Sequence, residues 1–285
     1  MALINYFIHL AVLIGIYAIF TVGLNIAVGF TGLLNLGHVG FFGIGAYTSA
    51  LLALAGVPLW IAIPAAAIVA GISGLVLALP TARLKGDYLA LAALGFTFIV
   101  GSVARNWTDL TRGPLGLPGI PRVVASTPLF LVIVVVLTVI IALAVHYLMK
   151  TRFGRTLQAI RDDELAAATL GYNTFLHKVI AMGISACIAG IAGALFAHYI
   201  SFIDPSVFGI GDLILVLSML IVGGLASIPG SIAGATIILL IPEPLRFIGF
   251  PSSLIGPMRE ILFALILLII IIYRPKGILG KVDLQ

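Results

Sequence analysis

Long apolar runs without a single charged residue dominate this chain. Lys, Arg, Asp and Glu are absent from residues 1–82, 123–149, 179–203 and 213–242. Each run reaches or exceeds the ~20 residues that an α-helix needs to cross ~30 Å of hydrocarbon. Apolar residues occupy every face of these runs, whereas a helix on the surface of a soluble domain needs only one apolar stripe. The pattern therefore predicts an all-α, polytopic helical bundle in a membrane.

Gly, Pro and charged residues divide the apolar runs into shorter predicted spans. We predict nine crossings, with eight or ten as alternatives, in a single domain that covers residues 1–285. The run 213–242 is expected to form two short spans separated at Pro229 and Gly230, because these residue types interrupt helices. The predicted spans are 4–29, 37–56, 58–80, 88–105, 128–150, 175–203, 211–227, 229–249 and 257–273.

The distribution of basic residues predicts the orientation of the bundle. With 81–87, 150–178 and 274–285 on the cytoplasmic side, that side holds ten of the 15 Lys and Arg residues. An excess of Lys and Arg in cytoplasmic loops is the usual rule. An even number of crossings then separates 150–178 from the C-terminus, which supports the division of 213–242. The same count places the N-terminus outside.

The composition excludes several other classes of protein. Hydrophobic residues make up 62% of the chain and charged residues 9%, whereas about a quarter of a soluble domain is charged. The net charge of +5 does not indicate nucleic-acid binding, because the basic residues flank apolar runs and form no stripe with interleaved aromatics. The single cysteine, Cys187, lies in an apolar run, so neither a disulfide framework nor a Cys-rich metal site is expected. We predict no metal and no cofactor.

Two further features concern the first and sixth predicted spans. Residues 2–28 lack a basic n-region and a small-residue cleavage site, so we expect a spanning helix rather than a signal peptide. The sixth span repeats small residues every four positions, which predicts close packing between helices in lipid. The two repeats are Ala186, Gly190 and Ala194, and Ala189, Gly193 and Ala197.

The segment 150–178 is a polar island in this apolar sequence. It holds eight of the 25 charged side chains (15 Lys and Arg plus 10 Asp and Glu), namely Lys150, Arg152, Arg155, Arg161, Asp162, Asp163, Glu164 and Lys178. We expect Gly154 to break the end of the fifth span. A short helix over 162–170 should follow, with acidic residues in its first turn. Gly171 supplies a left-handed stop and Asn173 can cap the next helix.

Several motifs together resemble a known family. They are 154–173 (GRTLQAIRDDELAAATLGYN), 35–47 (NLGHVGFFGIGAY), 85–90 (KGDYLA), 113–120 (GPLGLPGI) and 274–277 (RPKG). The first resembles the cytoplasmic coupling segment of ABC importer permeases. The set, in this order across nearly the whole chain, is most similar to the branched-chain amino-acid branch of that family (LivM-like).

The resemblance implies a role and a set of partners. The chain would be an importer permease for branched-chain amino acids or a related small polar solute in a bacterial inner membrane. It would pair with a second, homologous or identical permease, two cytoplasmic ABC ATPases and an extracytoplasmic solute-binding protein. The external segment 111–122 would receive the binding protein. ATPase coupling would fall to Gly154, Arg155, Arg161, Asp162, Asp163, Glu164, Ala167, Gly171 and Tyr172.

The coupling motif departs from the general importer pattern at one position. In that pattern two Ala residues follow Glu directly, whereas here Leu165 separates Glu164 from Ala166 and Ala167. The resemblance therefore supports a coupling role for Gly171 more directly than it supports particular contacts for Glu164. The alternative interpretation of 150–178 is an ordinary solvated loop that carries positive-inside residues.

The sequence shows no motif by which this chain could drive transport itself. It has no G-x-x-x-x-G-K-[ST] phosphate loop. An ion-coupled carrier usually keeps ionisable residues at mid-membrane, where they are costly and functional. None lies near the middle of a predicted span, which favours an external ATPase over the rival class of ion-coupled carrier or channel. A scaffold subunit is a third alternative, and no residue set suggests an enzyme.

Candidate pathway residues lie where the second span begins and where the run 213–242 divides. Residues 29–45 contain six glycines, which predicts a discontinuous helix. Such breaks occur where backbone faces protein or a water-filled cavity, and free amides there could bind a carboxylate. The candidates are Asn35, His38, Phe42, Gly45, Pro229 and Gly230. The alternative is that the glycines serve close packing and that His38 is a satisfied interhelical hydrogen-bonding residue.

Overall fold

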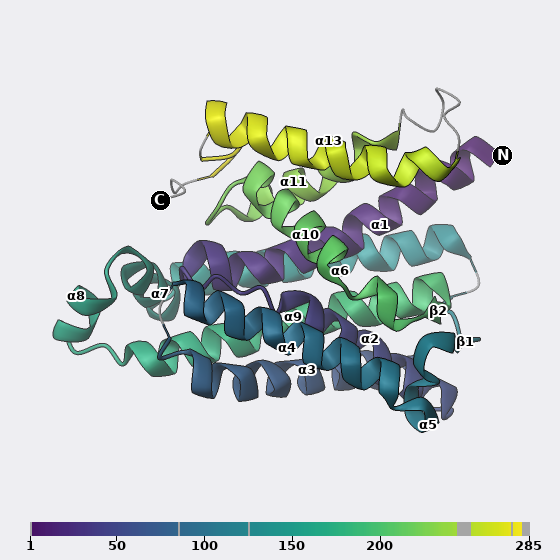
Figure 1. Ribbon diagram of the computed structural model, residues 1–285, viewed down its shortest axis with the longest axis horizontal. Coiled ribbons are helices and arrows are strands. Elements are labelled where there is room, and N and C mark those ends of the chain that lie inside the picture. Colours follow the sequence, from purple (N-terminus) through teal and green to yellow (C-terminus); the bar gives the residue numbers. More distant parts are fainter. Residues whose placement is uncertain (1, 85, 125, 244–251, 275, 281–285) are drawn as a thin grey trace.

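The computed structural model describes residues 2–84, 86–124, 126–243, 252–274 and 276–280. The regular secondary structure of the described chain is helical apart from one pair of two-residue strands, and its long helices lie roughly along one axis (Figure 1). The elements are α1 (Ala2–Asn25), the π-helix η1 (Ile26–Phe30), α2 (His38–Leu54), α3 (Leu59–Thr81), α4 (Asp87–Asn106), α5 (Thr108–Thr111), η2 (Gly113–Leu115), β1 (Leu117–Pro118), α6 (Thr127–Lys150), α7 (Arg152–Asp162), α8 (Glu164–Thr169), α9 (Thr174–Ile200), β2 (Phe202–Ile203), η3 (Pro205–Val207), α10 (Ile210–Gly223), α11 (Ile228–Leu240) and α13 (Ser252–Tyr273).

The predicted all-α, polytopic membrane class is confirmed. Within the described residues, six helical segments are long and apolar enough to cross a membrane: Ile4–Phe30, Leu59–Thr81, Asp87–Asn106, Thr127–Lys150, Thr174–Ile200 and Pro205–Gly223. The apolar helices α2 and α11 are shorter, with 17 and 13 residues, and α13 has 22. An apolar helix thus occupies each predicted span, although the end of the span at 229–249 lies outside the described residues. The count of nine crossings stays a prediction.

The bundle has two distinct ends. In Figure 1, α7 and α8 lie at one end, and α5, β1 and β2 lie at the other. Helix α1 begins at the β1–β2 end, whereas α13 finishes at the α8 end. This arrangement fits an odd number of crossings between the first and last helices. It also agrees with the prediction that the polar island and the C-terminal segment share one side.

Helix α9 forms the centre of the bundle, and its small residues explain why. It is the most buried of the six long spans and packs mainly between α3 and α2. Gly190 lies against Ala66 and Ala70 of α3, and Gly193 lies against the backbone carbonyl of Phe42 in α2. A Cβ at either glycine would collide with these neighbours. The predicted role of the small residues in helix packing is confirmed.

The close approach at Gly193 leads to a direct stability test. In a Gly193→Ala variant the new methyl would meet the Phe42 carbonyl and lie 3.0 Å from the Ala46 nitrogen, so rigid backbone would have to move. We expect the free energy of unfolding to fall by about 1–3 kcal/mol, the usual cost of overpacking. Thermal unfolding of the purified chain in detergent measures this. The matched control is Gly95→Ala in α4, where an added Cβ meets nothing within 4 Å. Equal melting temperatures for the two variants would contradict the packing described.

Candidate functional site

The polar island folds as two consecutive helices, α7 and α8, and not as one short helix after a break. The expectation that Gly154 breaks the fifth span is wrong. Helix α6 ends at Lys150, and Thr151 caps α7 by accepting a hydrogen bond from the Gly154 amide at 3.4 Å. Gly154 lies inside α7, close to the backbone of Met149, where a Cβ would not fit. Its lack of a side chain therefore lets α7 fold back against the end of α6.

The boundaries of the second short helix also differ from the prediction. Asp162 falls in the last turn of α7, outside the helix that was expected over 162–170. Asp163 is the N-cap of α8, because its carboxylate accepts a hydrogen bond from the Ala166 amide at 3.0 Å. Of the three acidic residues, Glu164 alone lies in the first turn of α8. The extended backbone of Asp163 separates the two helices.

The predicted end of α8 and start of α9 are confirmed. Gly171 has φ +89°, in the left-handed region, and its amide donates to the Ala168 carbonyl at 3.0 Å. The Tyr172 amide donates to the Ala167 carbonyl at 3.3 Å, which completes a Schellman ending. Asn173 then accepts a hydrogen bond from the Leu176 amide at 3.0 Å and begins α9.

Helix α8 presents an apolar surface to the outside while an ion pair holds it to α9. Leu165 and Leu170 are 69% and 76% exposed, and Ala167 is buried. Glu164 pairs with Lys178 of α9 at 2.5 Å, and the Lys178 side chain is almost fully buried. Exposed large apolar side chains beside charged ones are typical of a protein-binding surface. We call residues 163–172 the docking surface.

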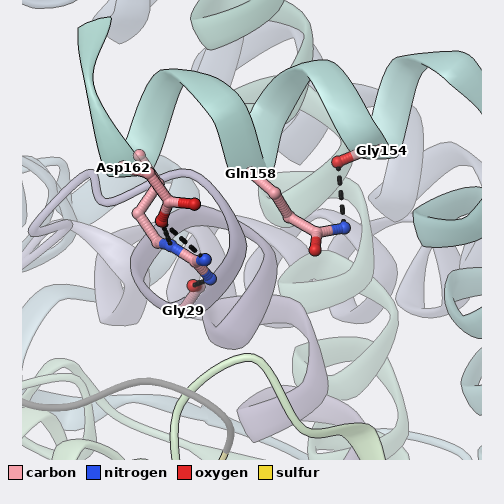
Figure 2. Close-up of polar contacts among 5 residues, drawn as sticks. Gly29, Gly154, Gln158 and Asp162 are labelled. Atoms are coloured by element: carbon pink, nitrogen blue, oxygen red, sulfur yellow. Dashed lines mark hydrogen bonds and ion pairs between the residues drawn. The ribbon is translucent and has the colours of Figure 1, made fainter.

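Arg161 connects this region to the helix break that follows α1. Its Nη1 donates to the carbonyl oxygen of Gly29 in η1 at 3.0 Å (Figure 2). Its Nε and Nη2 donate to the Asp162 carboxylate at 2.9 and 2.8 Å. The turn after η1 passes close to the same side chain, because a Cβ on Gly32 would lie 3.0 Å from the Arg161 Cγ. Arg161 therefore joins α7 to a backbone segment 132 residues earlier in the chain.

Asn25 is a central residue that the sequence pattern did not single out. It is fully buried where α1 passes into η1. Its Nδ2 donates to the Ser227 carbonyl at 3.0 Å and to the Ser231 hydroxyl at 2.7 Å, and its Oδ1 accepts from the Ala226 amide at 3.0 Å. The available signal was an amide side chain deep within a largely apolar span, since polar groups at membrane depth hold helices together.

These contacts form a continuous linkage from the docking surface into the bundle. Glu164 joins α8 to α9, Arg161 joins α7 to η1, and Asn25 joins η1 to the start of α11. A π-helical turn such as η1 is rare and often marks a functional position. The arrangement can transmit a displacement of α7 to η1 and to the turn before α11.

Two predicted pathway residues, Asn35 and His38, lie in the turn before α2 and at the first residue of α2. Asn35 is fully buried, and its Oδ1 accepts from the Gly37 amide at 3.0 Å, whereas its Nδ2 has no hydrogen-bond partner among the described residues. His38 stacks on Phe20, and its two ring nitrogens lie 3.0 Å from the Phe20 carbonyl and 3.4 Å from the Ser185 hydroxyl. The environment of His38 matches the alternative of a satisfied interhelical residue.

The other pathway candidates pack against neighbouring helices. Phe42 is buried among the rings of Phe20, Phe196 and Phe208, and Gly45 packs directly on the Gly190 backbone of α9. Helices α10 and α11 are separated as predicted, but the break covers residues 224–227 and not Pro229 and Gly230, because α10 already ends at Gly223 and α11 begins at Ile228. Gly230 is packed against the Gly223 carbonyl, and Pro229 lies in the first turn of α11. The pathway candidates thus form one group on α2 and in the turn before it, and another at the start of α11.

A comparison of the sequence with known families identifies the class of protein. The model of the branched-chain amino acid transport system / permease component matches residues 6–272. The chain belongs to this family. The resemblance inferred from the motifs is therefore confirmed, and the protein is a multi-pass membrane transport permease.

Individual relatives agree with this assignment. The high-affinity branched-chain amino acid transport system permease protein LivM of Escherichia coli (strain K12) is 33% identical over 95% of this chain and 69% of its own. LivH of the same organism is 25% identical over 94% and 92%. The probable LivM of Methanocaldococcus jannaschii is 26% identical over 78% and 68%. Among solved structures, PsaBC from Streptococcus pneumoniae in complex with Fab aligns with a TM-score of 0.49 at 17% identity, over 94% of this chain and 91% of that one.

The permease has a folded loop at the end opposite α8. This loop includes α5, η2 and β1, and β1 pairs with β2 so that Leu117 faces Ile203. His198 at the end of α9 lies 2.8 Å from the Pro121 carbonyl and 2.7 Å from the Ser49 hydroxyl. These contacts fix the loop over α2 and α9. The segment expected to meet a binding protein is thus a structured surface of the permease.

Proposed function

We propose that this permease carries branched-chain amino acids, or a related small polar solute, across a bacterial inner membrane as one subunit of an ABC importer. Its partners are a second permease, two cytoplasmic ATPases and an extracytoplasmic solute-binding protein. Residues 1–285 act as one transmembrane domain with nine crossings. The polar island is cytoplasmic, and the loop around β1 faces the binding protein.

The observation that carries the proposal is the hydrogen bond from Arg161 to the Gly29 carbonyl. It joins the helix beside the docking surface to the one π-helical turn of the described chain, which lies in its first span. The ATPases bind the docking surface, and their closure on ATP moves α8 and α7 together. Arg161 then displaces η1, and Asn25 conveys this displacement to the start of α11. The motor is external, and the permease supplies the mechanical linkage.

The pathway lies along the break between η1 and α2 and reaches the start of α11. Asn35 supports this placement, because its buried Nδ2 group has no protein partner among the described residues. A buried amide without a partner is costly unless something else satisfies it. A carboxylate or carbonyl oxygen of the passing solute is a suitable acceptor. Gly45 of α2 and Gly193 of α9 let these two helices approach closely.

Two rival functions predict different results in transport experiments. An ion-coupled carrier needs titratable groups along its pathway, whereas Asp212 and Lys178 lie within the first two turns of α10 and α9. Such a carrier would transport in vesicles that contain no ATPase. A scaffold subunit without a pathway would retain full uptake when Asn35 and His38 are both made apolar.

The proposal is tested by changing the turn that ends the docking surface. Gly171→Val forces a β-branched residue to φ +89°, which costs about 1–3 kcal/mol, although an added Cβ meets nothing within 4 Å. We expect membrane insertion and ATP hydrolysis to persist while uptake per ATP falls roughly tenfold, the equivalent of ~1.4 kcal/mol. Proteoliposomes with the complete set of subunits give both rates.

The matched control at this position is Gly171→Asn, because asparagine tolerates the left-handed conformation. We expect this variant to remain coupled. Normal uptake per ATP in Gly171→Val would contradict the role given to the turn. Equal loss in both variants would show that the side chain itself, and not the backbone conformation, disturbs the surface.

A further inference from the structure

A cleft of about 580 Å³ lies beside α7, apart from the docking surface. Its walls come from the end of α6, the side of α7, the last residue of η1 and the segment that begins α11. Four of the lining residues are basic or titratable cations, and none of the described lining residues is acidic. These four are His146, Lys150, Arg155 and Arg161.

Two of these cations are available to a ligand. Arg161 is engaged with Asp162 and the Gly29 carbonyl. Lys150 and Arg155 are exposed, and neither takes part in an ion pair with another described residue. They come from two different helices and meet across one cleft, on either side of the sharp connection at Thr151. This arrangement places two positively charged residues along one cleft.

The cleft lies at the end of α6, a helix whose outer surface has the character of a lipid-facing one. Helix α6 is the least buried of the six long spans, and it contains no glycine. Its exposed side chains are large and aliphatic, including Val132, Val136 and Ile140. Helix–helix interfaces in membranes are instead enriched in small residues. The exposed face of α6 therefore has the composition of a lipid-facing surface.

The depth of the cleft matches the headgroup region. Tyr147, in the last turn of α6, is 66% exposed, and Lys150 ends the helix. Tyrosines gather where the membrane meets water, and lysines near helix ends extend toward the headgroups. Lys150 thus lies at the level of lipid phosphates. The lining also has an apolar part, formed by Phe30, Ile228 and Pro229.

We propose that this cleft binds the phosphate of an anionic phospholipid. Lys150 and Arg155 contact the phosphate, and the apolar wall receives the first part of an acyl chain. Basic pockets between membrane helices at the cytoplasmic surface are suited to acidic headgroups. The bound lipid would hold α6, α7 and the start of α11 together, beside the linkage that Arg161 makes. A free phosphate compound shares the anionic chemistry but lacks the acyl chain.

The test compares lipids and charges in the full-length permease, purified with the subunits that accompany it and stripped of lipid in detergent. Native mass spectrometry measures binding of phosphatidylglycerol, phosphatidylcholine and soluble glycerol 3-phosphate. The test variant is Lys150→Gln with Arg155→Gln. The matched control is Arg152→Gln, which removes an exposed charge from the same helix outside the cleft. A second variant, Lys150→Arg with Arg155→Lys, keeps both charges and checks that substitution alone is tolerated.

We expect phosphatidylglycerol to bind more tightly than phosphatidylcholine. The double glutamine variant should weaken this binding roughly 30-fold, since each cation near a membrane surface contributes about fivefold. The Arg152→Gln control and the charge-keeping variant should stay within about twofold of the unchanged chain.

Four results would overturn the proposal. They are unchanged lipid binding in the double glutamine variant, equal weakening in the Arg152→Gln control, equal affinity for the two lipids, and tight binding of glycerol 3-phosphate that matches the lipid. If the first result came with loss of an ATPase subunit from the double variant, the cleft would be a protein contact instead.

Discussion

Replacing Arg161 with glutamine should uncouple ATP hydrolysis from uptake while leaving the helices in place. Glutamine cannot span the Gly29 carbonyl and the Asp162 carboxylate, which Arg161 reaches with three nitrogens. Loss of a hydrogen bond to a charged group costs about 1.5–3 kcal/mol, so we expect uptake per ATP to fall roughly 10- to 100-fold. The measurement is the ratio of solute imported to ATP hydrolysed in proteoliposomes with all subunits present.

Two further variants separate the effect of losing the Arg161 hydrogen bonds from the effect of losing a positive charge. Arg161→Lys keeps the charge but cannot reproduce the planar fork of the guanidinium group. Its uptake per ATP should therefore lie between that of the unchanged chain and that of the glutamine variant. Arg152→Gln removes an exposed arginine of the same helix and should leave the coupling ratio unaltered. A normal ratio in Arg161→Gln would show that force does not pass through η1.

Replacing Asn25 with leucine should both destabilise the permease and abolish its uptake. Leucine has a similarly branched side chain, but it leaves the Ala226 amide and the Ser227 carbonyl without the partner that Asn25 provides. Each buried polar group that loses its partner costs about 1–3 kcal/mol, so we expect the free energy of unfolding to fall by about 2–4 kcal/mol in all. Uptake should be lost because the start of α11 is no longer held to η1. Thermal unfolding in detergent and uptake in proteoliposomes measure the two effects.

Asn106 provides the control for this substitution. It is exposed at the end of α4, and its side chain donates to the Ser102 carbonyl of its own helix at 2.8 Å. Asn106→Leu should change stability by less than about 0.5 kcal/mol, as exposed substitutions usually do. If Asn25→Leu were equally mild, the contacts around η1 would not hold α11 in place.

The sequence was sufficient to locate the helices because membrane spans leave a strong and local signal. Length, the absence of charge, and the Gly and Pro positions put an apolar helix at each predicted span. The caps at Gly171 and Asn173 were predictable for the same reason, since each depends on residues within four positions. The packing role of Gly190 and Gly193 followed from the repeats of small residues every four positions along one helix.

The parts that were missed depend on contacts between distant segments. The bond from Arg161 to Gly29 and those from Asn25 to the start of α11 join residues 132 and more than 200 positions apart. No local pattern contains them. At Gly154 a local pattern was present but led to the wrong prediction. A glycine after a span suggests a break, yet in this chain it permits a close contact, and the cap at Thr151 decides where the new helix begins.

The most direct test of the central claim is uptake by the reconstituted importer with all ion gradients collapsed by ionophores. We predict that vesicles containing the permease, its partner permease, the ATPases and the binding protein import branched-chain amino acids when ATP is supplied on the cytoplasmic side. Without ATP, or with the permeases alone, uptake should stop. Accumulation of solute by the permease alone on an ion gradient would contradict the account.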